Sequence, residues 1–358
     1  MPGHDIIVIG ASAGGVEALL TIARALPEDL PAAVFVVLHI SPYARSVLPE
    51  LLSRTGPLPA VHARNGETIQ PGRIYVAPPD HHLLVRREGV SVTRGPQENG
   101  VRPAVDVLFR TAATAFRKRV VGVVLSGNLD DGTAGLAAIH RFGGVTVVQH
   151  PDEALYPGMP TNAVENVPVQ YIRPLAEIAP LLVKLAREPV EEPMPAPFPS
   201  DGHDGELEME ANVSNMDPAA IHDRKRPGQP SVFGCPDCHG TLFELHDSEL
   251  TRFRCRVGHA YSPESLLAAQ SDGIEAALWT ALRALEEKVA LTERMLQRMR
   301  ARGHRASLAH FERQSQDTQQ QAEVLRQLLV HNNGGGGGGT IPGDSSAGAP
   351  PPRVPTKL

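Results

Sequence analysis

Short apolar runs alternate with amphipathic stretches over the first half of the chain. Each run is rich in Val and Ile and ends in turn residues, which is typical of buried strands. Between several runs, apolar residues recur at helical spacing, as from Val16 to Ala23 and from Leu175 to Leu185. The alternation predicts an α/β fold, a doubly wound and mainly parallel sheet with helices on both faces. The predicted strands are IIVIG, AAVFVVLH, RIYVAPP, RVVGVVLSG, VTVVQ and VQYIR, and HLLVRREGVSVTRG adds a β-hairpin.

This periodicity stops after Glu188. The next stretch is rich in Pro, Gly and acidic residues and has few large apolar ones, so it lacks the apolar surface to fold alone. We therefore expect residues 1–188 to form the α/β domain and residues 189–230 to be a disordered acidic and Pro-rich linker. A Cys-containing module over 231–270 follows, then two helical stretches over 271–331. The Gly- and Pro-rich residues 332–358 are expected to be a disordered tail.

Two stretches in the last third of the chain have the 4-3 apolar spacing of a narrow coiled-coil seam. Residues 302–304 are a short break between them, so we expect an antiparallel helical hairpin. The seam serves either as an intramolecular stalk or as a surface for self-association or a partner. Its positions are Leu278, Leu282, Leu285, Val289, Thr292, Leu296 and Met299, then Leu308, Phe311, Ser315, Thr318, Ala322, Leu325 and Leu329.

Composition narrows the classes of function. The 358 residues carry a formal net charge of −6, which gives no general attraction to nucleic acid or anionic lipid. The longest apolar runs, 32–38 and 120–125, are too short for a membrane span, and the start of the chain lacks a signal-peptide pattern. We therefore expect a cytoplasmic protein with no membrane insertion and no nucleic-acid partner.

The first predicted strand ends in a glycine-rich turn, GASAGG at residues 10–15. Glycines let the backbone turn sharply there and leave N–H groups pointing outward at a helix N-terminus, which suits an anion. Two functions use that geometry. Either the turn cradles a nucleotide phosphate, or it presents Ser12 as a nucleophile while the helix N-terminus supports an oxyanion.

Two further strand ends bear on this choice. A dinucleotide site calls for an acidic residue at the end of the second strand, but the residue there is His39, which suits a general base. A third strand end, VVLSGNLDDG, brings Asp130 and Asp131, and a carboxylate there orients an imidazole. Taken singly, each residue also has a structural explanation, with Ser12 as a helix cap, His39 as a surface residue and the aspartates as turn residues.

Six segments follow one another in the first half of the chain: DIIVIGASAGGVEAL, VVLHISP, PGRIYVAPPDHHL, RPAVDVLF, VVLSGNLDDGTAGL and PGMPTNAV. In this order and spacing they resemble the catalytic domain of the chemotaxis protein-glutamate methylesterases, the CheB family. The resemblance covers about Asp5 to Glu188. It implies a serine hydrolase with Ser12 as nucleophile, His39 as base and Asp131 as third member, and no metal or cofactor in catalysis. It also implies hydrolysis of glutamyl methyl esters on methyl-accepting chemotaxis receptors, often with glutamine deamidation.

The surroundings of this site raise further expectations. Backbone N–H groups near Ala13 and in the Gly127-Asn128 turn are candidate oxyanion donors, and Asn128 replaces the methionine that is usual in the family. Arg102 either contacts an acidic receptor helix or forms a structural salt bridge. The family often has a phosphorylatable receiver domain before the esterase, whereas this chain starts a few residues before the first strand, so we expect a stand-alone form.

Two histidine-containing motifs invite a metal hypothesis. His81 and His82 are adjacent on an extended segment and point to opposite faces, so we interpret them as turn residues. The second motif has zinc-ribbon spacing, which predicts a structural zinc ion with His239 or His246 as substitutes for the histidine ligand. A redox C-x-x-C is disfavoured because its βαβ context is missing. The predicted ligands are Cys235, Cys238, Cys255 and His259.

The sequence therefore favours a serine esterase acting on methylated signalling receptors, with the Cys module and the helical hairpin used for interaction. The alternative from another class is a non-catalytic signalling adaptor that keeps the esterase fold as a receptor-binding surface. A nucleotide-binding protein is disfavoured by the missing acidic residue after the second strand.

Overall fold

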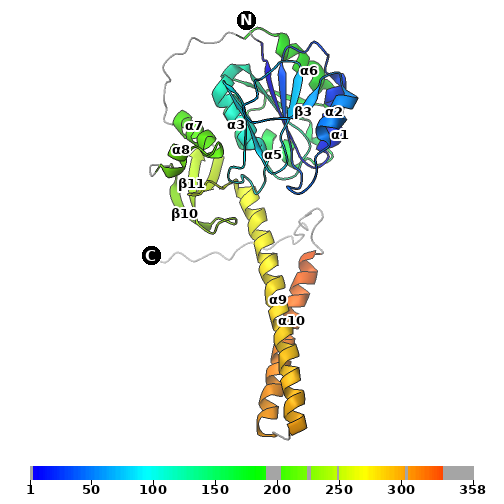
Figure 1. The fold of residues 1–358 in the computed structure, drawn as a ribbon, viewed down its shortest axis with the longest axis vertical. Helices are drawn as coiled ribbons and strands as arrows, with labels where there is room; N and C mark the ends of the chain where they lie inside the picture. Colours follow the sequence, from blue (N-terminus) through cyan, green and yellow to red (C-terminus); the bar gives the residue numbers. More distant parts are fainter. Residues whose placement is uncertain (1–2, 191–202, 224–226, 248–249, 303–304, 334–358) are drawn as a thin grey trace, which may run out of the picture. The chain divides into compact units, whose positions relative to one another are not determined.

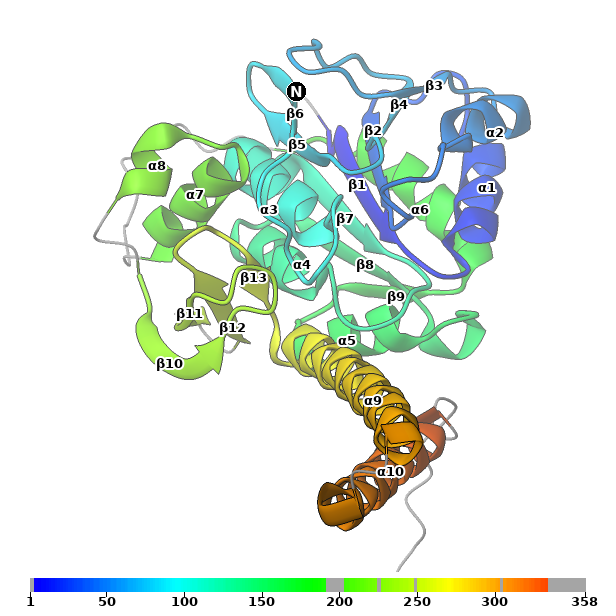
Figure 2. The same ribbon diagram turned by 60° about the horizontal axis from the view of Figure 1, so that its bottom comes forward.

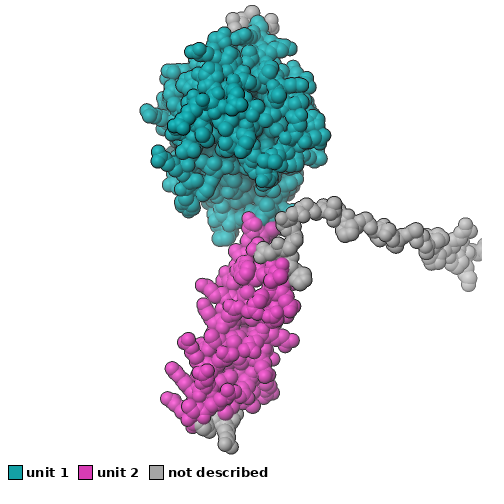
Figure 3. All heavy atoms as spheres, turned by 90° about the vertical axis from the view of Figure 1, so that its right-hand side faces the viewer, with its two compact units in different colours: residues 1–270 teal, residues 271–358 magenta. Residues whose placement is uncertain are grey.

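The computed structural model describes residues 3–190, 203–223, 227–247, 250–302 and 305–333 (Figure 1). The chain divides into two compact units, residues 1–270 and residues 271–358, coloured separately in Figure 3. Among the helices in the described ranges, none combines the length and apolar composition needed to cross a bilayer. The expected tail over 332–358 lies almost wholly outside the described residues.

Seven parallel strands form the central sheet of the first unit, in the order β3-β4-β2-β1-β7-β8-β9. This confirms the predicted doubly wound parallel sheet. The central strands are continuous apolar runs because helices cover both of their faces. The chain leaves β1 for β2 on one side and later returns to β7 on the other, and ligand crevices form at such a switch point. The strands are β1 (Ile6–Ala11), β2 (Ala33–Leu38), β3 (Ala60–His62), β4 (Arg73–Val76), β7 (Val120–Val124), β8 (Val145–Gln149) and β9 (Tyr171–Arg173).

Helices cover the sheet on both faces (Figure 2). On one face, α1 (Gly15–Ala25), α2 (Leu48–Thr55) and α6 (Leu175–Arg187) bury their apolar sides. On the other lie α3 (Val105–Phe116), α4 (Thr133–Arg141) and α5 (Gly158–Asn166). The hairpin of β5 (His82–Arg86) and β6 (Gly89–Thr93) packs against α3. Strand β3 was not predicted, because three residues are too few to show a period.

A second, smaller part of the first unit packs beside α3. It comprises α7 (His203–Ser214), α8 (Pro218–His222) and a four-stranded sheet of β10 (Gln229–Gly234), β11 (Thr241–Asp247), β12 (Leu250–Cys255) and β13 (Ala260–Tyr261). The prediction of a disordered linker over 189–230 is therefore wrong for residues 203–222, which form α7 and α8. Residues 191–202 and 224–226 lie outside the described residues.

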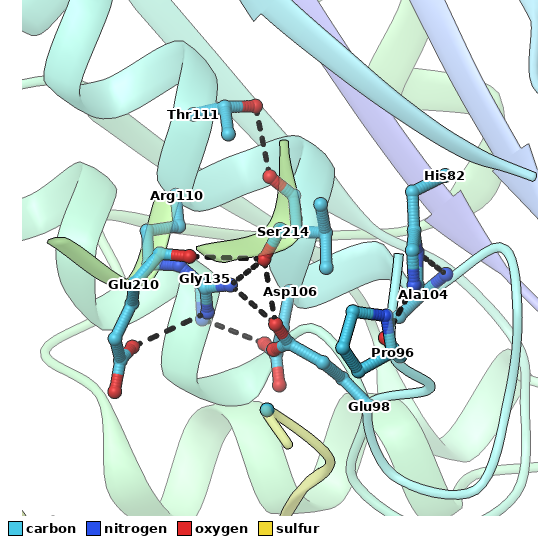
Figure 4. A network of polar contacts seen from close by, with 12 residues as sticks. His82, Pro96, Glu98, Ala104, Asp106, Arg110, Thr111, Gly135, Glu210 and Ser214 are labelled. Atoms are coloured by element: carbon cyan, nitrogen blue, oxygen red, sulfur yellow. Dashed lines mark hydrogen bonds and ion pairs between the residues drawn. The ribbon is translucent and has the colours of Figure 1, made fainter. Parts of the chain in front are cut away.

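The reason for this difference is a set of buried charges between α7, α3 and β12. Figure 4 shows three of them, Glu98, Arg110 and Glu210. Glu210 on α7 is 1% exposed and forms ion pairs with Arg110, Arg252 and Arg254. Glu98 accepts hydrogen bonds from Arg110 at 2.7 Å and from Arg254 at 3.1 Å. Glu210, one of the acidic residues that indicated a solvated linker, is thus a partner of buried arginines. The Cys module and the α/β domain form one compact unit.

The second unit contains a helical hairpin. Its helices are α9 (Pro263–Arg302), whose first eight residues belong to the first unit, and α10 (Arg305–Asn333). Arg300 pairs with Glu312, and Glu286 pairs with Arg326, so the helices run antiparallel. Many seam positions selected by the 4-3 spacing carry buried side chains, namely Leu282, Thr292, Leu296, Ser315, Thr318, Ala322 and Leu329.

Candidate active site

Ser12 and His39 lie next to each other at the carboxyl edge of the sheet. Strands β1 and β2 pair in parallel with Ala11 opposite Leu38, so the two residues follow paired positions. The His39 backbone N–H donates to the Ala11 carbonyl at 3.1 Å, and the Ser12 N–H donates to the Ser126 carbonyl at 2.9 Å. The ends of β1, β2 and β7 therefore meet at this point.

Gly14 shapes the turn that presents Ser12. It has φ of 71° and serves as the N-cap of α1, with no side chain capping the helix. A Cβ at this position would lie 2.8 Å from the Ser126 hydroxyl, so both conformation and space require glycine. The Ser12 side chain therefore does not act as a helix cap.

His39 and Asp131 are in direct contact. The His39 Nε2 atom lies 2.7 Å from the Asp131 Oδ2 atom, and the two side chains are 14% and 4% exposed. The ion-pair geometry assigns the Nε2 proton to this bond, which leaves Nδ1 as the basic nitrogen. Among the described residues, no hydrogen bond joins the Ser12 hydroxyl to His39. The structure thus brings two of the three predicted residues into contact and places the third beside them.

Helix α3 begins at the carboxylate of Asp131. The backbone N–H groups of Val105 and Asp106 donate to it at 2.7 and 3.1 Å, and an N-terminal helix turn stabilises negative charge. Burial alone would raise the pKa of Asp131, but the hydrogen bond and charge of His39 and these two N–H groups lower it below its ordinary value. Asp131 is therefore a charged acceptor for the His39 ring.

Asp106 accepts hydrogen bonds from the start of α4, just as Asp131 accepts them from the start of α3. Its Oδ1 atom accepts the N–H groups of Gly132 and Gly135 at 3.0 and 2.7 Å. Burial and the neighbouring charge of Asp131 raise the pKa of Asp106. A Cβ at Gly135 would lie 2.5 Å from the Phe109 Cβ atom, so glycine permits the close approach of α3 and α4 that holds both aspartates.

Asp130 has a different environment from Asp131. It accepts a hydrogen bond from the Ser262 hydroxyl at 2.9 Å, whereas the His39 ring is hydrogen-bonded to Asp131. Burial raises the pKa of Asp130 to about 7, against the effect of Ser262 and with the support of Glu264 and Asp131. Of the two adjacent aspartates, Asp131 is therefore the one placed to orient the imidazole.

Backbone N–H groups surround the Ser12 turn. The N–H of Gly127 already donates to the Tyr156 carbonyl at 2.9 Å, so Gly127 does not supply an oxyanion donor in this conformation. The N–H groups of Ala13 and Asn128 donate to no group among the described residues. They remain the two candidate donors.

Ser126 was not among the predicted site residues. Its hydroxyl donates to the Ala13 carbonyl at 2.8 Å and accepts the Tyr156 N–H at 2.9 Å, which ties the Ser12 turn to the loop before α5. Gly127 packs closely too, because a Cβ there would lie 2.1 Å from the Met159 sulfur and 2.8 Å from the Ser12 Cβ. The sequence signal for both residues was their place at the end of β7.

Arg102 forms a structural salt bridge, one of its two predicted roles. Its guanidinium donates to Asp80 at 2.6 and 2.9 Å and to the Gly95 carbonyl at 2.7 Å. The His81 Nδ1–H donates to the Pro79 carbonyl at 2.8 Å. The buried His82 has both ring nitrogens bonded to backbone, at Pro96 and Ala104, and burial lowers its pKa to about 4.

The four predicted zinc ligands lie together in the Cys module, within 4.8 Å of one another. The Cys238 and Cys255 sulfurs are 3.6 Å apart, and the His259 Nδ1 atom lies 3.7 Å from Cys235 and 3.6 Å from Cys255. Ligands around a tetrahedral zinc ion, with bonds of about 2.0–2.3 Å, are about 3.5–3.8 Å apart. The residues therefore fit zinc.

The thiol pKa values and the surrounding sheet disfavour a redox-active C-x-x-C. Burial raises the pKa of Cys235 to about 12 and also raises that of Cys255, whereas redox-active thiols have a lowered pKa. The sheet around them is antiparallel, with no βαβ unit.

Comparison with known proteins identifies relatives of a single family. The sequence profile of the family described as CheB methylesterase matches residues 7–182. A Pyrococcus horikoshii protein named protein-glutamate methylesterase/protein-glutamine glutaminase is 36% identical over 51% of this chain and 51% of its own length. A Leptospira interrogans protein that bears this name provisionally is 36% identical over 53% of this chain and 98% of its own length.

A solved structure of the Thermotoga maritima CheB methylesterase catalytic domain is also similar, with 32% identity and a TM-score of 0.49 over 51% of this chain and 98% of that chain. The Leptospira protein is matched over almost its whole length. The Pyrococcus protein is matched over about half. The chain thus belongs to the CheB methylesterase family, and residues 7–182 are its methylesterase domain.

Proposed function

We propose that this protein hydrolyses methyl esters of glutamate side chains on chemoreceptor-like signalling proteins, with Ser12, His39 and Asp131 as its catalytic triad. The observation that carries the proposal is the 2.7 Å contact between His39 and Asp131 beside Ser12 at one edge of the sheet. The relatives' names, protein-glutamate methylesterase/protein-glutamine glutaminase, support the substrate class and a second activity, deamidation of glutamine. We place the reaction in the cytoplasm.

The first half of the reaction forms an acyl-enzyme. The Ser12 oxygen attacks the ester carbonyl while His39 Nδ1 takes the hydroxyl proton, and Asp131 stabilises the resulting imidazolium. The N–H groups of Ala13 and Asn128, which have no acceptor among the described residues, would donate to the oxyanion. Collapse of the tetrahedral intermediate breaks the bond to the methoxy group, which leaves as methanol with the proton from His39.

The second half releases the product. A water molecule gives a proton to His39 and attacks the acyl carbon, and the bond to Ser12 breaks as His39 returns the proton to the serine oxygen. The receptor is left with a glutamate carboxylate. A glutamine side chain would follow the same course with ammonia as the leaving group, which gives glutamate again.

We further propose that the Cys module holds one structural zinc ion through Cys235, Cys238, Cys255 and His259. The metal would supply folding free energy, since the buried apolar cluster of the module has only six members and two of them are ligands. No step of the esterase reaction uses this metal. The receptor is the proposed partner of the esterase edge, and the hairpin of α9 and α10 is a surface for self-association or a second partner.

The test is methanol release from receptor-containing membranes that carry labelled methyl groups. The full chain is compared with Ser12→Ala and with Ser53→Ala, a control serine whose hydroxyl hydrogen-bonds to the backbone of Ala60. We expect Ser12→Ala to lower the rate by at least about a thousandfold and Ser53→Ala to leave it near the wild-type value. If the wild type binds the receptor without releasing methanol, the adaptor function replaces this one.

A further inference from the structure

The Cys module touches the loop before α3 through its own backbone. The Asn99 N–H donates to the Ala260 carbonyl at 2.7 Å, and the Ala260 N–H donates to the Gln97 carbonyl at 3.2 Å. Ala260 directly follows His259, a member of the Cys3His cluster. The second knuckle of the module is therefore joined to the loop that contains Asn99.

The side chain of Asn99 continues this connection into the active site. Its Nδ2 atom donates to Asp131 Oδ1 at 3.0 Å and to Asp106 Oδ2 at 2.9 Å. Its Oδ1 atom accepts the Ser262 N–H at 3.1 Å and the Ser265 hydroxyl at 3.0 Å. Both donors and both lone pairs of the amide are used, so the side chain is fixed from two sides.

The backbone conformation of Asn99 allows its side chain to bridge the Cys module and the two aspartates. Its φ is 54°, in the left-handed region that asparagine adopts more readily than other side chains. The left-handed conformation lets the N–H face Ala260 while the side chain faces the two aspartates. Glycine also adopts this conformation without strain, so a variant exists that removes the amide and keeps the backbone.

We propose that Asn99 is a positioning residue for Asp131, and that residues 260–265 of the Cys module hold Asn99 in place. The path is short: Ala260 and Ser265 fix Asn99, Asn99 donates to Asp131, and Asp131 accepts from His39. The Cys module is then part of the catalytic framework of the esterase. This inference rests on the proposed triad.

The charge balance predicts the direction of the effect. Asp131 Oδ1 accepts two hydrogen bonds, from Asn99 and from the Asp106 N–H. Without the amide, less of the carboxylate charge is compensated by donors, so Asp131 becomes a stronger acceptor for the His39 Nε2–H. The carboxylate should also be less firmly oriented.

The experiment compares the full chain with Asn99→Gly and Ser265→Ala, and with Met216→Gly as a matched control. Met216 also has a positive φ, 61°, but its side chain is 48% exposed and lies outside the site. The readouts are kcat and KM for hydrolysis of p-nitrophenyl acetate, and the proton NMR chemical shift of the His39 Nε2–H in protein with labelled histidine rings. The His39 signal is assigned by its absence in His39→Gln.

We expect Asn99→Gly to lower kcat about tenfold with little change in KM and to move the NMR signal of the His39 Nε2–H downfield. Ser265→Ala should have smaller effects in the same direction, and Met216→Gly should match the wild type. An unchanged or upfield-shifted signal in Asn99→Gly, or unchanged kcat, would overturn the proposal. If Ser12→Ala hydrolyses the ester as fast as the wild type, the proposed function fails, and the His39 signal still decides whether Asn99 positions the pair.

Discussion

Two adjacent aspartates in the same turn have opposite electrostatic environments. Asp131 accepts hydrogen bonds from His39, from Asn99 and from the start of α3, and its pKa is lowered. Asp130 has one hydroxyl donor, Ser262, and burial raises its pKa to about 7. The donors that face each carboxylate therefore decide which aspartate is charged beside the imidazole.

This difference predicts how stability depends on pH. The folded pKa of Asp130, about 7, lies above its ordinary value of 3.8, so the contribution of Asp130 to wild-type stability should fall as pH rises from about 4 to about 7, by up to about 1.4 kcal/mol per pH unit. Asp130→Asn cannot ionise and should lack this loss. The measurement is the free energy of urea unfolding of both proteins between pH 4 and pH 8.

The comparison is made as a difference because His82 acts in the opposite direction. Its pKa is lowered to about 4, so its contribution to stability is lost as pH falls through this range, equally in both proteins. The stability of Asp130→Asn relative to wild type should increase from pH 4 to pH 7. Parallel curves would contradict the environment described for Asp130.

Sequence reasoning placed the candidate triad residues at strand ends but missed Asn99, which donates a hydrogen bond to Asp131. Ser12, His39 and Asp131 follow three predicted strands, and the carboxyl ends of neighbouring parallel strands meet at one edge. Asn99 follows no strand, and its partners are 32 positions away at Asp131 and 163 positions away at Ser262. No local pattern could join them.

At the scale of elements, two tight turns bring the four Cys3His ligands together. The His239 N–H donates to the Cys235 carbonyl at 2.8 Å, and the Gly258 N–H donates to the Cys255 carbonyl at 3.0 Å, where Gly258 has φ of 118°. Each turn presents a pair of ligands, and the spacing in the sequence was enough to predict the set. The docking of these turns against residues 97–99 was not predictable from spacing.

We expect purified protein to contain about one zinc ion per chain, and Cys235→Ser to contain none. Loss of the metal should also lower esterase turnover, because Ala260 and Ser262 lie directly after the second turn. The measurements are metal analysis, thermal melting and p-nitrophenyl acetate hydrolysis of the full chain. Thr280→Ser, on the exposed side of α9, is the control. Zinc-free wild type with the same melting curve as Cys235→Ser would rule out the zinc site.

At the scale of the whole molecule, buried ion pairs join the α/β domain and the Cys module to α7, whose residues the composition had assigned to a disordered linker. Leu207, Ala211 and Val213 of α7 are buried, although they lie within an acidic stretch. Their apolar spacing is short and interrupted, so the hydrophobic pattern alone did not predict a docked helix. Glu210 lies among these residues, and its partners are on α3 and β12. Because these partners are distant in the sequence, no local pattern could reveal the ion pairs.

The buried network predicts a large effect for one glutamate and none for its neighbour. Glu210→Gln leaves Arg110, Arg252 and Arg254 with less compensating charge, and should lower the free energy of unfolding of the full chain by about 3 kcal/mol. Glu208→Gln changes an exposed side chain on the same helix and should stay within about 0.5 kcal/mol of wild type. Urea unfolding of both variants measures this, and equal stabilities would show that the network does not hold α7 in place.

The central claim is that Ser12 is the nucleophile of a methylesterase, and covalent labelling tests it most directly. The full chain is treated with a fluorophosphonate, which forms a stable adduct with an activated serine oxygen, and the labelled peptide is located by mass spectrometry. The account predicts one adduct per chain, on the peptide that contains Ser12, and strongly reduced labelling in His39→Gln. Labelling of a different serine, or methanol release by a Ser12→Ala protein that takes up no label, would contradict it.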